Sequence, residues 1–119
     1  MKDFINDRFK SIGIAFKGLY LLIRTESNIK VQLAIGSLVT LIGLSVGLSP
    51  TEWILQTFAI ALVMSAEGLN TAVEKIADVI HPDHNTAIGF IKDIAAGAVL
   101  ITALAAIVVG CIIYIPKLM

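Results

Sequence analysis

Apolar residues are gathered into long runs along the chain. No charged residue interrupts residues 31–51, 53–66 or 94–116. The first and third runs reach the length of about 20 residues that a helix needs to cross a bilayer, whereas the second is shorter. The second run crosses only if its helix continues through the more polar segment that follows it. The pattern therefore predicts three membrane spans, at about residues 29–48, 52–80 and 91–115.

The N-terminal segment has a helical period without a continuous apolar run. Within residues 4–24, apolar side chains recur at spacings of three and four and form one broad helical face. Lys10, Lys17 and Arg24 form a separate stripe at intervals of seven. This arrangement predicts an amphipathic helix lying in the membrane surface, with its cations towards the lipid headgroups. A helix packed on a partner protein is the alternative.

The composition supports a membrane protein. Hydrophobic residues make up 57% and charged residues 15% of the 119-residue chain, against about 45–50% and 25% in soluble domains. We therefore expect an all-α membrane protein in which residues 1–119 form a single domain. The lone cysteine, Cys111, excludes a disulfide framework.

The distribution of basic residues predicts the orientation in the membrane. Six lysines and arginines precede the first charge-free run at residue 31, the connection around LSPTEW has none, and the segment from Lys75 to Lys92 has two. Under the positive-inside rule, the N-terminus and the second connection face the cytoplasm. The C-terminus then lies outside.

Helix-breaking residues predict where the spans end, and small residues predict where they pack. We expect Ser49-Pro50 to end the first span, and the connection HPDHNTAIGF, residues 81–90, to interrupt the second helix at Pro82. Gly43 and Gly47 form a GxxxG pair inside the first span. Small residues let helices approach closely in lipid, so this pair predicts helix packing.

The second span runs into a row of acidic residues. Glu67, Glu74 and Asp78 return to nearly the same side of a helix, with Asn70 slightly off this line. Carboxylates beside hydrocarbon are costly, so the row must be masked, hydrated or bound to a cation. Topology brings the starts of the first and third spans to the same cytoplasmic level. The predicted cluster there consists of Glu26, Glu67, Asn70, Glu74, Asp78, Lys92 and Asp93.

The residue types in this cluster fit more than one kind of chemistry. Separated carboxylates with a lysine and an asparagine suit Mg²⁺ and a polyphosphate, and phosphoryl transfer needs a metal, a phosphate-binding cation and a base. No Walker A motif is present. A row of membrane acids also suits a proton or cation pathway, and a structural or assembly role is a further possibility.

Separated motifs in the chain carry a resemblance to a known family. The run EGLNTAVEKIAD, from Glu67 to Asp78, is followed by KDIAAGAV, from Lys92 to Val99. FKGL lies at residues 16–19 and RTExN at residues 24–28. Together they resemble the signature of prokaryotic diacylglycerol kinases and their undecaprenol kinase relatives, and the resemblance covers nearly the whole chain.

The resemblance implies a fold, a reaction and a location. Members are homotrimers of three-span protomers with an N-terminal surface helix, and neighbouring subunits share each active site. They transfer the γ-phosphate of MgATP to a lipid hydroxyl, that of diacylglycerol or of undecaprenol, on the cytoplasmic side of the bacterial inner membrane. The expected cofactor is Mg²⁺. The expected partners are ATP, a membrane lipid and further copies of the chain, and nucleic acid is not among them.

The resemblance also implies roles for the residues that react with or bind the lipid and the metal. Glu67 would be the general base on the lipid hydroxyl, and Asn70 would position this substrate beside it. Glu26 and Glu74 would hold the metal that bridges the ATP phosphates.

The nucleotide site implied by the resemblance involves residues of the surface helix, of the segment before the first span, and of the second and third spans. Lys92 would contact phosphate, Asp78 and Asp93 would frame the nucleotide with Glu26 and Glu74, and Lys17 would contact the nucleotide or a headgroup. Family members often carry a basic residue just before the Lys-Asp pair, where this chain has Gly89-Phe90-Ile91. No contact is therefore assigned to that position.

Overall fold

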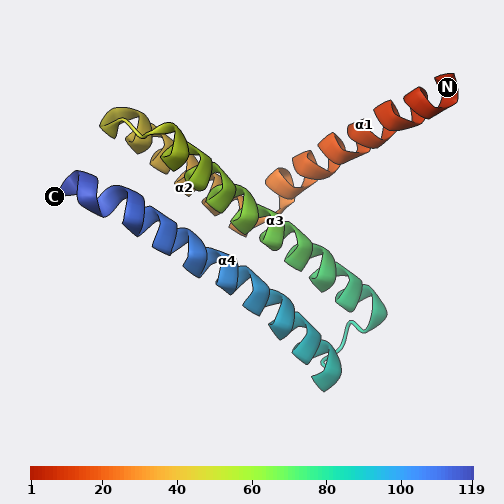
Figure 1. Ribbon diagram of the computed structural model, residues 1–119. Helices are drawn as coiled ribbons and strands as arrows, with labels where there is room; N and C mark the ends of the chain where they lie inside the picture. Colours follow the sequence, from red (N-terminus) through yellow and green to blue (C-terminus); the bar gives the residue numbers. More distant parts are fainter.

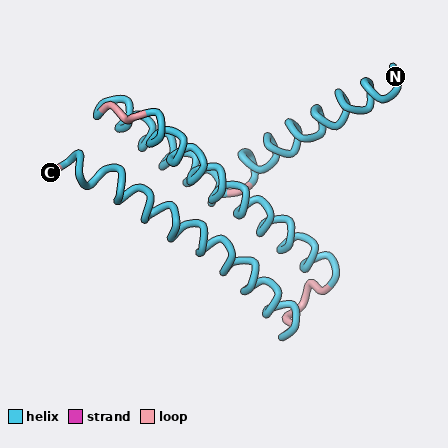
Figure 2. Tube along the Cα trace, viewed as in Figure 1, coloured by secondary structure: helices cyan, strands magenta, loops and turns pink.

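The computed structural model describes residues 1–119 as four α-helices joined by short connections (Figures 1 and 2). Three of them are long and apolar enough to cross a membrane, which confirms the expected all-α chain with three candidate spans. Helices α2, α3 and α4 lie together, whereas α1 extends away from them (Figure 1). The helices are α1 (Lys2–Thr25), α2 (Ser27–Val46), α3 (Pro50–Ile80) and α4 (Thr86–Leu118).

Helix α1 touches the rest of the chain only near its C-terminal end. Residues 2–21 are all exposed, and the side chain of Leu22 lies against Gly68 of α3, where an added Cβ would come within 3.1 Å of Leu22 Cδ1. Glu26 separates α1 from α2 with an extended backbone, φ −104° and ψ 115°. Its extended conformation turns the chain sharply between the two helices. The surface position of α1 in a membrane stays a prediction.

The turn between α2 and α3 differs from the expectation. Gly47 ends α2 in the left-handed region at φ 74°, and its N–H donates to the carbonyl of Gly43. Ser49 begins α3 with a capping box, in which its hydroxyl accepts from the Glu52 N–H and the Glu52 carboxylate accepts from the Ser49 N–H. The prediction that Ser49-Pro50 ends the first span is therefore wrong. Proline at the first helical position favours a helix start, because its missing N–H is not needed there.

The connection between α3 and α4 is shorter than residues 81–90. Helix α3 ends at Ile80, and α4 already begins at Thr86 because the Asn85 side chain accepts hydrogen bonds from the N–H groups of Ala87 and Ile88. Sequence inspection overlooked this N-cap. As a result, Lys92 and Asp93 lie about two turns inside α4 rather than in front of it.

The glycines of α2 accommodate side chains rather than the backbone of a neighbouring helix. An added Cβ on Gly43 would come within 2.9 to 3.0 Å of the side chains of Leu48, Trp53 and Tyr114. Gly47 lies outside the helix, and a Cβ there would meet nothing. Gly43 therefore lets side chains of α3 and α4 approach α2 closely, as predicted, whereas Gly47 takes no part in helix packing within the chain. Gly43 leaves room for an aromatic cluster, and Gly47 makes a turn.

A polar network fixes the end of the bundle where α2 meets α3. The Tyr114 hydroxyl of α4 lies 3.0 Å from the Val39 carbonyl oxygen of α2 and 2.5 Å from Gln56 Oε1 of α3. Lys117 Nζ lies 3.1 Å from Glu52 Oε1. All three helices are thus joined at this end by groups that satisfy one another.

Candidate active site

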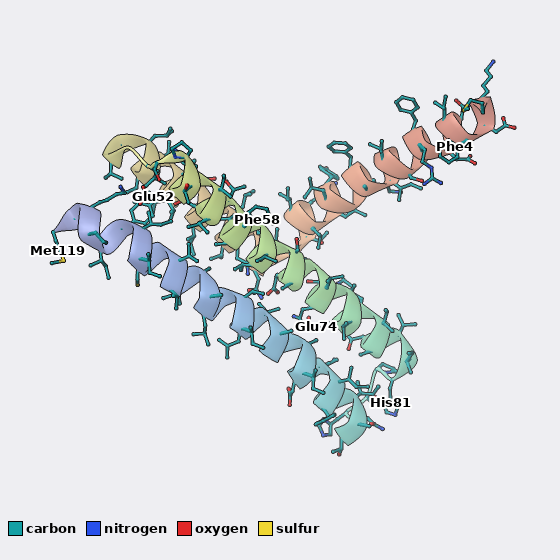
Figure 3. All side chains as sticks on the ribbon, viewed as in Figure 1. Phe4, Glu52, Phe58, Glu74, His81 and Met119 are labelled. Carbon is teal, nitrogen blue, oxygen red and sulfur yellow. The ribbon has the colours of Figure 1, made fainter.

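The predicted cluster lies along α3, from its middle towards the end opposite the α2–α3 turn. The start of α2 lies beside the middle of α3, where Asn28 contacts Glu67, and the start of α4 lies beside the end of α3, where Lys92 contacts Asp78. Figure 3 shows Glu74 and His81 towards this end of the bundle, with Glu52 and Met119 at the other. The 31 residues of α3 extend about 46 Å, which exceeds the roughly 30 Å thickness of a bilayer core. A span of about 20 residues that began at Pro50 would end near Asn70 and would leave Glu74 and Asp78 beyond the hydrocarbon.

Glu67 is the most deeply enclosed acid of the cluster. Its residue is only 5% exposed. Asn28 Nδ2 donates to Glu67 Oε1 at 3.0 Å, across the α2–α3 contact. The second oxygen, Oε2, has no hydrogen-bond partner in the chain and is not fully buried. One carboxylate oxygen is therefore held, and the other is free to accept a proton or a hydrogen bond.

Asn70 lies next to this carboxylate on the following turn of α3. It is 7% exposed, and its Nδ2 donates to Glu74 Oε1 at 3.3 Å. Its Oδ1 is buried and has no partner in the chain. A buried polar atom without a partner is uncommon and costly, which makes this oxygen a candidate for contact with a bound hydroxyl or a neighbouring subunit.

The two predicted metal ligands come from different segments. Glu26 reaches α3 through an ion pair in which its Oε1 lies 3.6 Å from Lys75 Nζ, and Lys75 is the residue after Glu74. No group of three or more His, Cys, Asp or Glu side chains comes together. Mg²⁺ commonly binds one or two protein carboxylates together with substrate phosphates and water. Glu26 and Glu74 supply the carboxylates that such a site needs, but within the chain they contact Lys75 and Asn70 rather than each other.

The residues predicted to contact the nucleotide are only partly assembled. Lys92 Nζ of α4 lies 2.6 Å from Asp78 Oδ1 of α3, so these two residues meet but neutralise each other. Asp93 is exposed and has no partner in the chain. Lys17 lies on the exposed part of α1 and makes no hydrogen bond or ion pair. Within one chain, Lys17 is therefore not brought to the cluster.

Sequence inspection missed polar residues of α2 on the side of the cluster. Asn28 contacts Glu67, and Gln32, one turn further along α2, has a buried Oε1 without a partner. Asn28 is the last residue of the RTExN motif, so the motif contained this signal. Gln32 follows Asn28 by four residues, which places both side chains on one face of a helix, and this spacing was the signal for Gln32.

Comparison with known proteins identifies the family. The model of the family "Prokaryotic diacylglycerol kinase" matches residues 13–114. An undecaprenol kinase from Bacillus subtilis is 37% identical over 114 residues, which cover 96% of this chain and 93% of that protein. A diacylglycerol kinase from Synechocystis is 31% identical over 117 residues, which cover 92% of this chain and 63% of that protein. The chain therefore belongs to the prokaryotic diacylglycerol kinase family, whose members are phosphotransferases with an alcohol acceptor.

Proposed function

We propose that this protein transfers the γ-phosphate of MgATP to the hydroxyl of a membrane lipid, with undecaprenol as the preferred acceptor and diacylglycerol as the second candidate. The observation that carries the proposal is the state of Glu67. Its carboxylate is almost fully enclosed, one oxygen is held by Asn28, and the other oxygen has no partner. A base at this depth reaches a hydroxyl that a lipid presents from within the membrane.

In the proposed reaction, Glu67 Oε2 accepts the proton of the lipid hydroxyl. The hydroxyl oxygen attacks the γ-phosphorus, and the bond from that phosphorus to the β,γ-bridging oxygen breaks so that ADP leaves. The buried Asn70 Oδ1, fixed through the bond from Nδ2 to Glu74, is placed to contact the acceptor beside the base. A positioned base typically contributes about 10²–10⁴-fold to the rate of a proton transfer.

Glu26 and Glu74 would hold the Mg²⁺ ion, which supplies neutralisation of the phosphate charge when it is bound. Glu26 pairs with Lys75, the residue after Glu74, in the part of α3 that we expect to lie beyond the hydrocarbon. Lys92 would contact phosphate, with Asp78 and Asp93 nearby. Since Lys92 is paired with Asp78 at 2.6 Å, nucleotide binding requires the lysine to exchange this partner for a phosphate oxygen.

The choice of undecaprenol is supported by the extent of the similarity. The Bacillus subtilis relative named undecaprenol kinase matches this chain over 93% of its own length, whereas the Synechocystis diacylglycerol kinase matches over 63%. We propose a homotrimer in the bacterial inner membrane, with the N-terminus and the active site on the cytoplasmic side and each site shared between subunits. The exposed apolar residues of α2 and α4 suit contact with lipid or neighbouring subunits.

The test is ATP turnover by the purified chain in mixed micelles with Mg²⁺, comparing undecaprenol, diacylglycerol and no lipid. We expect ADP release that depends on lipid and is faster with undecaprenol. A faster rate with diacylglycerol would overturn the preferred acceptor but not the kinase. No release with either lipid from folded protein, together with ion flux in proteoliposomes, would instead support an acid-lined cation or proton pathway.

A further inference from the structure

One hydrogen bond connects α2 with the enclosed carboxylate of α3. Asn28 Nδ2 donates to Glu67 Oε1 at 3.0 Å, although the two residues are 39 positions apart in the sequence. Asn28 lies in the first turn of α2, and Glu67 lies in the second half of α3. The contact therefore fixes the carboxylate of one helix against the start of another.

No other group in the chain holds this carboxylate. The three ion pairs involve Glu26, Asp78 and Glu52, so no lysine or arginine reaches Glu67. Glu67 accepts no hydrogen bond other than the one from Asn28. An enclosed carboxylate depends on such donors, because it has lost most of its hydration. The amide of Asn28 is thus the one protein group that fixes the orientation of this side chain.

The bond makes the two oxygens of the carboxylate unequal. Oε1 accepts from Asn28, whereas Oε2 has no partner and remains accessible. Because the carboxylate is planar, holding Oε1 restricts the positions that Oε2 can take. A base acts efficiently only when it lies within hydrogen-bond distance of the proton that it removes.

We infer that Asn28 is a positioning residue, which holds Glu67 so that Oε2 is aimed at the acceptor hydroxyl. This inference rests on the proposed function, because it assigns Asn28 an effect on the proton transfer through Glu67. In this proposal Asn28 acts through Glu67 and contacts neither the lipid nor ATP. The competing explanation is that Asn28 merely joins α2 to α3.

The first variant is Asn28→Ala, measured by lipid-dependent ATP turnover in mixed micelles. Asn28 is exposed, so its truncation leaves no cavity in the bundle. We expect kcat to fall between about tenfold and a hundredfold, as for loss of one hydrogen bond to a charged group. The KM for MgATP should stay within about twofold, because the nucleotide-contacting residues are unchanged. The neighbouring exposed Ser27→Ala is the matched control, and it should behave like the wild type.

The isosteric variant Asn28→Asp separates positioning from packing. It keeps the size of the side chain but replaces the donor amide with a second carboxylate beside Glu67. Two like charges at this distance repel, so we expect kcat to fall below that of Asn28→Ala. If Asn28 only joined α2 to α3, the folded aspartate variant would be as active as the folded alanine variant. An aspartate variant at least as active as the alanine variant, or an unchanged kcat for Asn28→Ala, would overturn the inference.

A double-mutant cycle with Glu67→Asp tests whether Asn28 acts through Glu67. The shorter side chain withdraws the carboxylate from the amide, so Asn28→Ala should cost less than about threefold in this background. If the fold-losses in kcat of Asn28→Ala and Glu67→Asp multiplied fully in the double variant, Asn28 would not act through Glu67. Unaltered elution and thermal midpoint identify variants that are folded. If Glu67→Gln retains wild-type turnover, the proposed base itself fails; if Glu67→Gln is inactive and Asn28→Ala is normal, only the role of Asn28 fails.

Discussion

The two ends of the bundle contain similar polar groups in different states. At the end with the α2–α3 turn, Tyr114, Gln56, Glu52 and Lys117 satisfy one another within the chain. At the other end, Asn70 Oδ1 is buried without a partner, and Glu67 Oε2 is unbound. Natural proteins pair nearly all of their buried polar atoms. The paired end is therefore expected to serve stability, and the unpaired end to serve binding and chemistry.

Substitution of Glu67 gives the strongest test of the difference between the two ends of the bundle. Glu67→Gln removes the proposed base while keeping the shape of the side chain, so we expect turnover to fall by about 10²–10⁴-fold. MgATP binding should remain, because Glu67 is not a proposed metal ligand. Lipid-dependent ADP release measures the first quantity, and nucleotide titration measures the second. If Glu67→Gln turned over ATP nearly as fast as the wild type, the end of the bundle with Glu67 would not be the site of chemistry.

Glu74 should produce a smaller effect of a different kind. Glu74→Ala removes one of the two proposed Mg²⁺ ligands and the partner of the Asn70 amide. Removing a carboxylate oxygen from a hard cation weakens its binding, so the Mg²⁺ concentration for half-maximal rate should rise by about tenfold or more, with a lower maximal rate. A Mg²⁺ titration of turnover makes the comparison with the wild type. A half-maximal concentration equal to that of the wild type would argue against ligation.

At the paired end, Tyr114→Phe should change stability and leave catalysis alone. The variant keeps the ring but removes the hydroxyl that lies near Val39 and Gln56. Hydrogen bonds between membrane helices contribute about 0.6 to 1.7 kcal/mol each, so unfolding should become easier by about 1 kcal/mol. Thermal unfolding in detergent measures this loss. A large fall in kcat with normal folding would show that this end is not merely structural.

The smallest effect is expected at Lys117. Its ion pair with Glu52 has a separation of 3.1 Å, but both side chains are 25% exposed, and solvent screens such pairs. Lys117→Gln should therefore lower the stability less than Tyr114→Phe does and leave turnover unchanged. The same unfolding assay at low and high salt checks this. A salt-independent loss above that of Tyr114→Phe would reverse the ranking.

Much of the architecture could be predicted from the chain. Charge-free runs identified the three long apolar helices, and antiparallel connection placed Glu26, Glu67 and Lys92 at one end. The predicted helix ends were wrong where local capping and turn residues decide them, because a hydropathy pattern does not register such residues. The Asn85 cap starts α4 earlier than expected, and the left-handed Gly47 separates the end of α2 from the start of α3.

Most residues of the candidate site could be predicted from the sequence, but the contacts between their side chains could not. Helical periodicity places a residue on a face but does not specify which oxygen of Glu67 receives the Asn28 amide. It also does not reveal that Lys92 contacts Asp78 rather than standing free. Such choices depend on the distance between helices and on side-chain rotamers, which the one-dimensional pattern does not determine.

Glu26 occupies a mechanically special place, since it is the one residue between α1 and α2. The 24 residues of α1 form a helix about 36 Å long that is joined to α2 through this one residue. If α1 lies in the membrane surface as predicted, a tilt of this helix about Glu26 would move its N-terminal end furthest and the proposed magnesium carboxylate least.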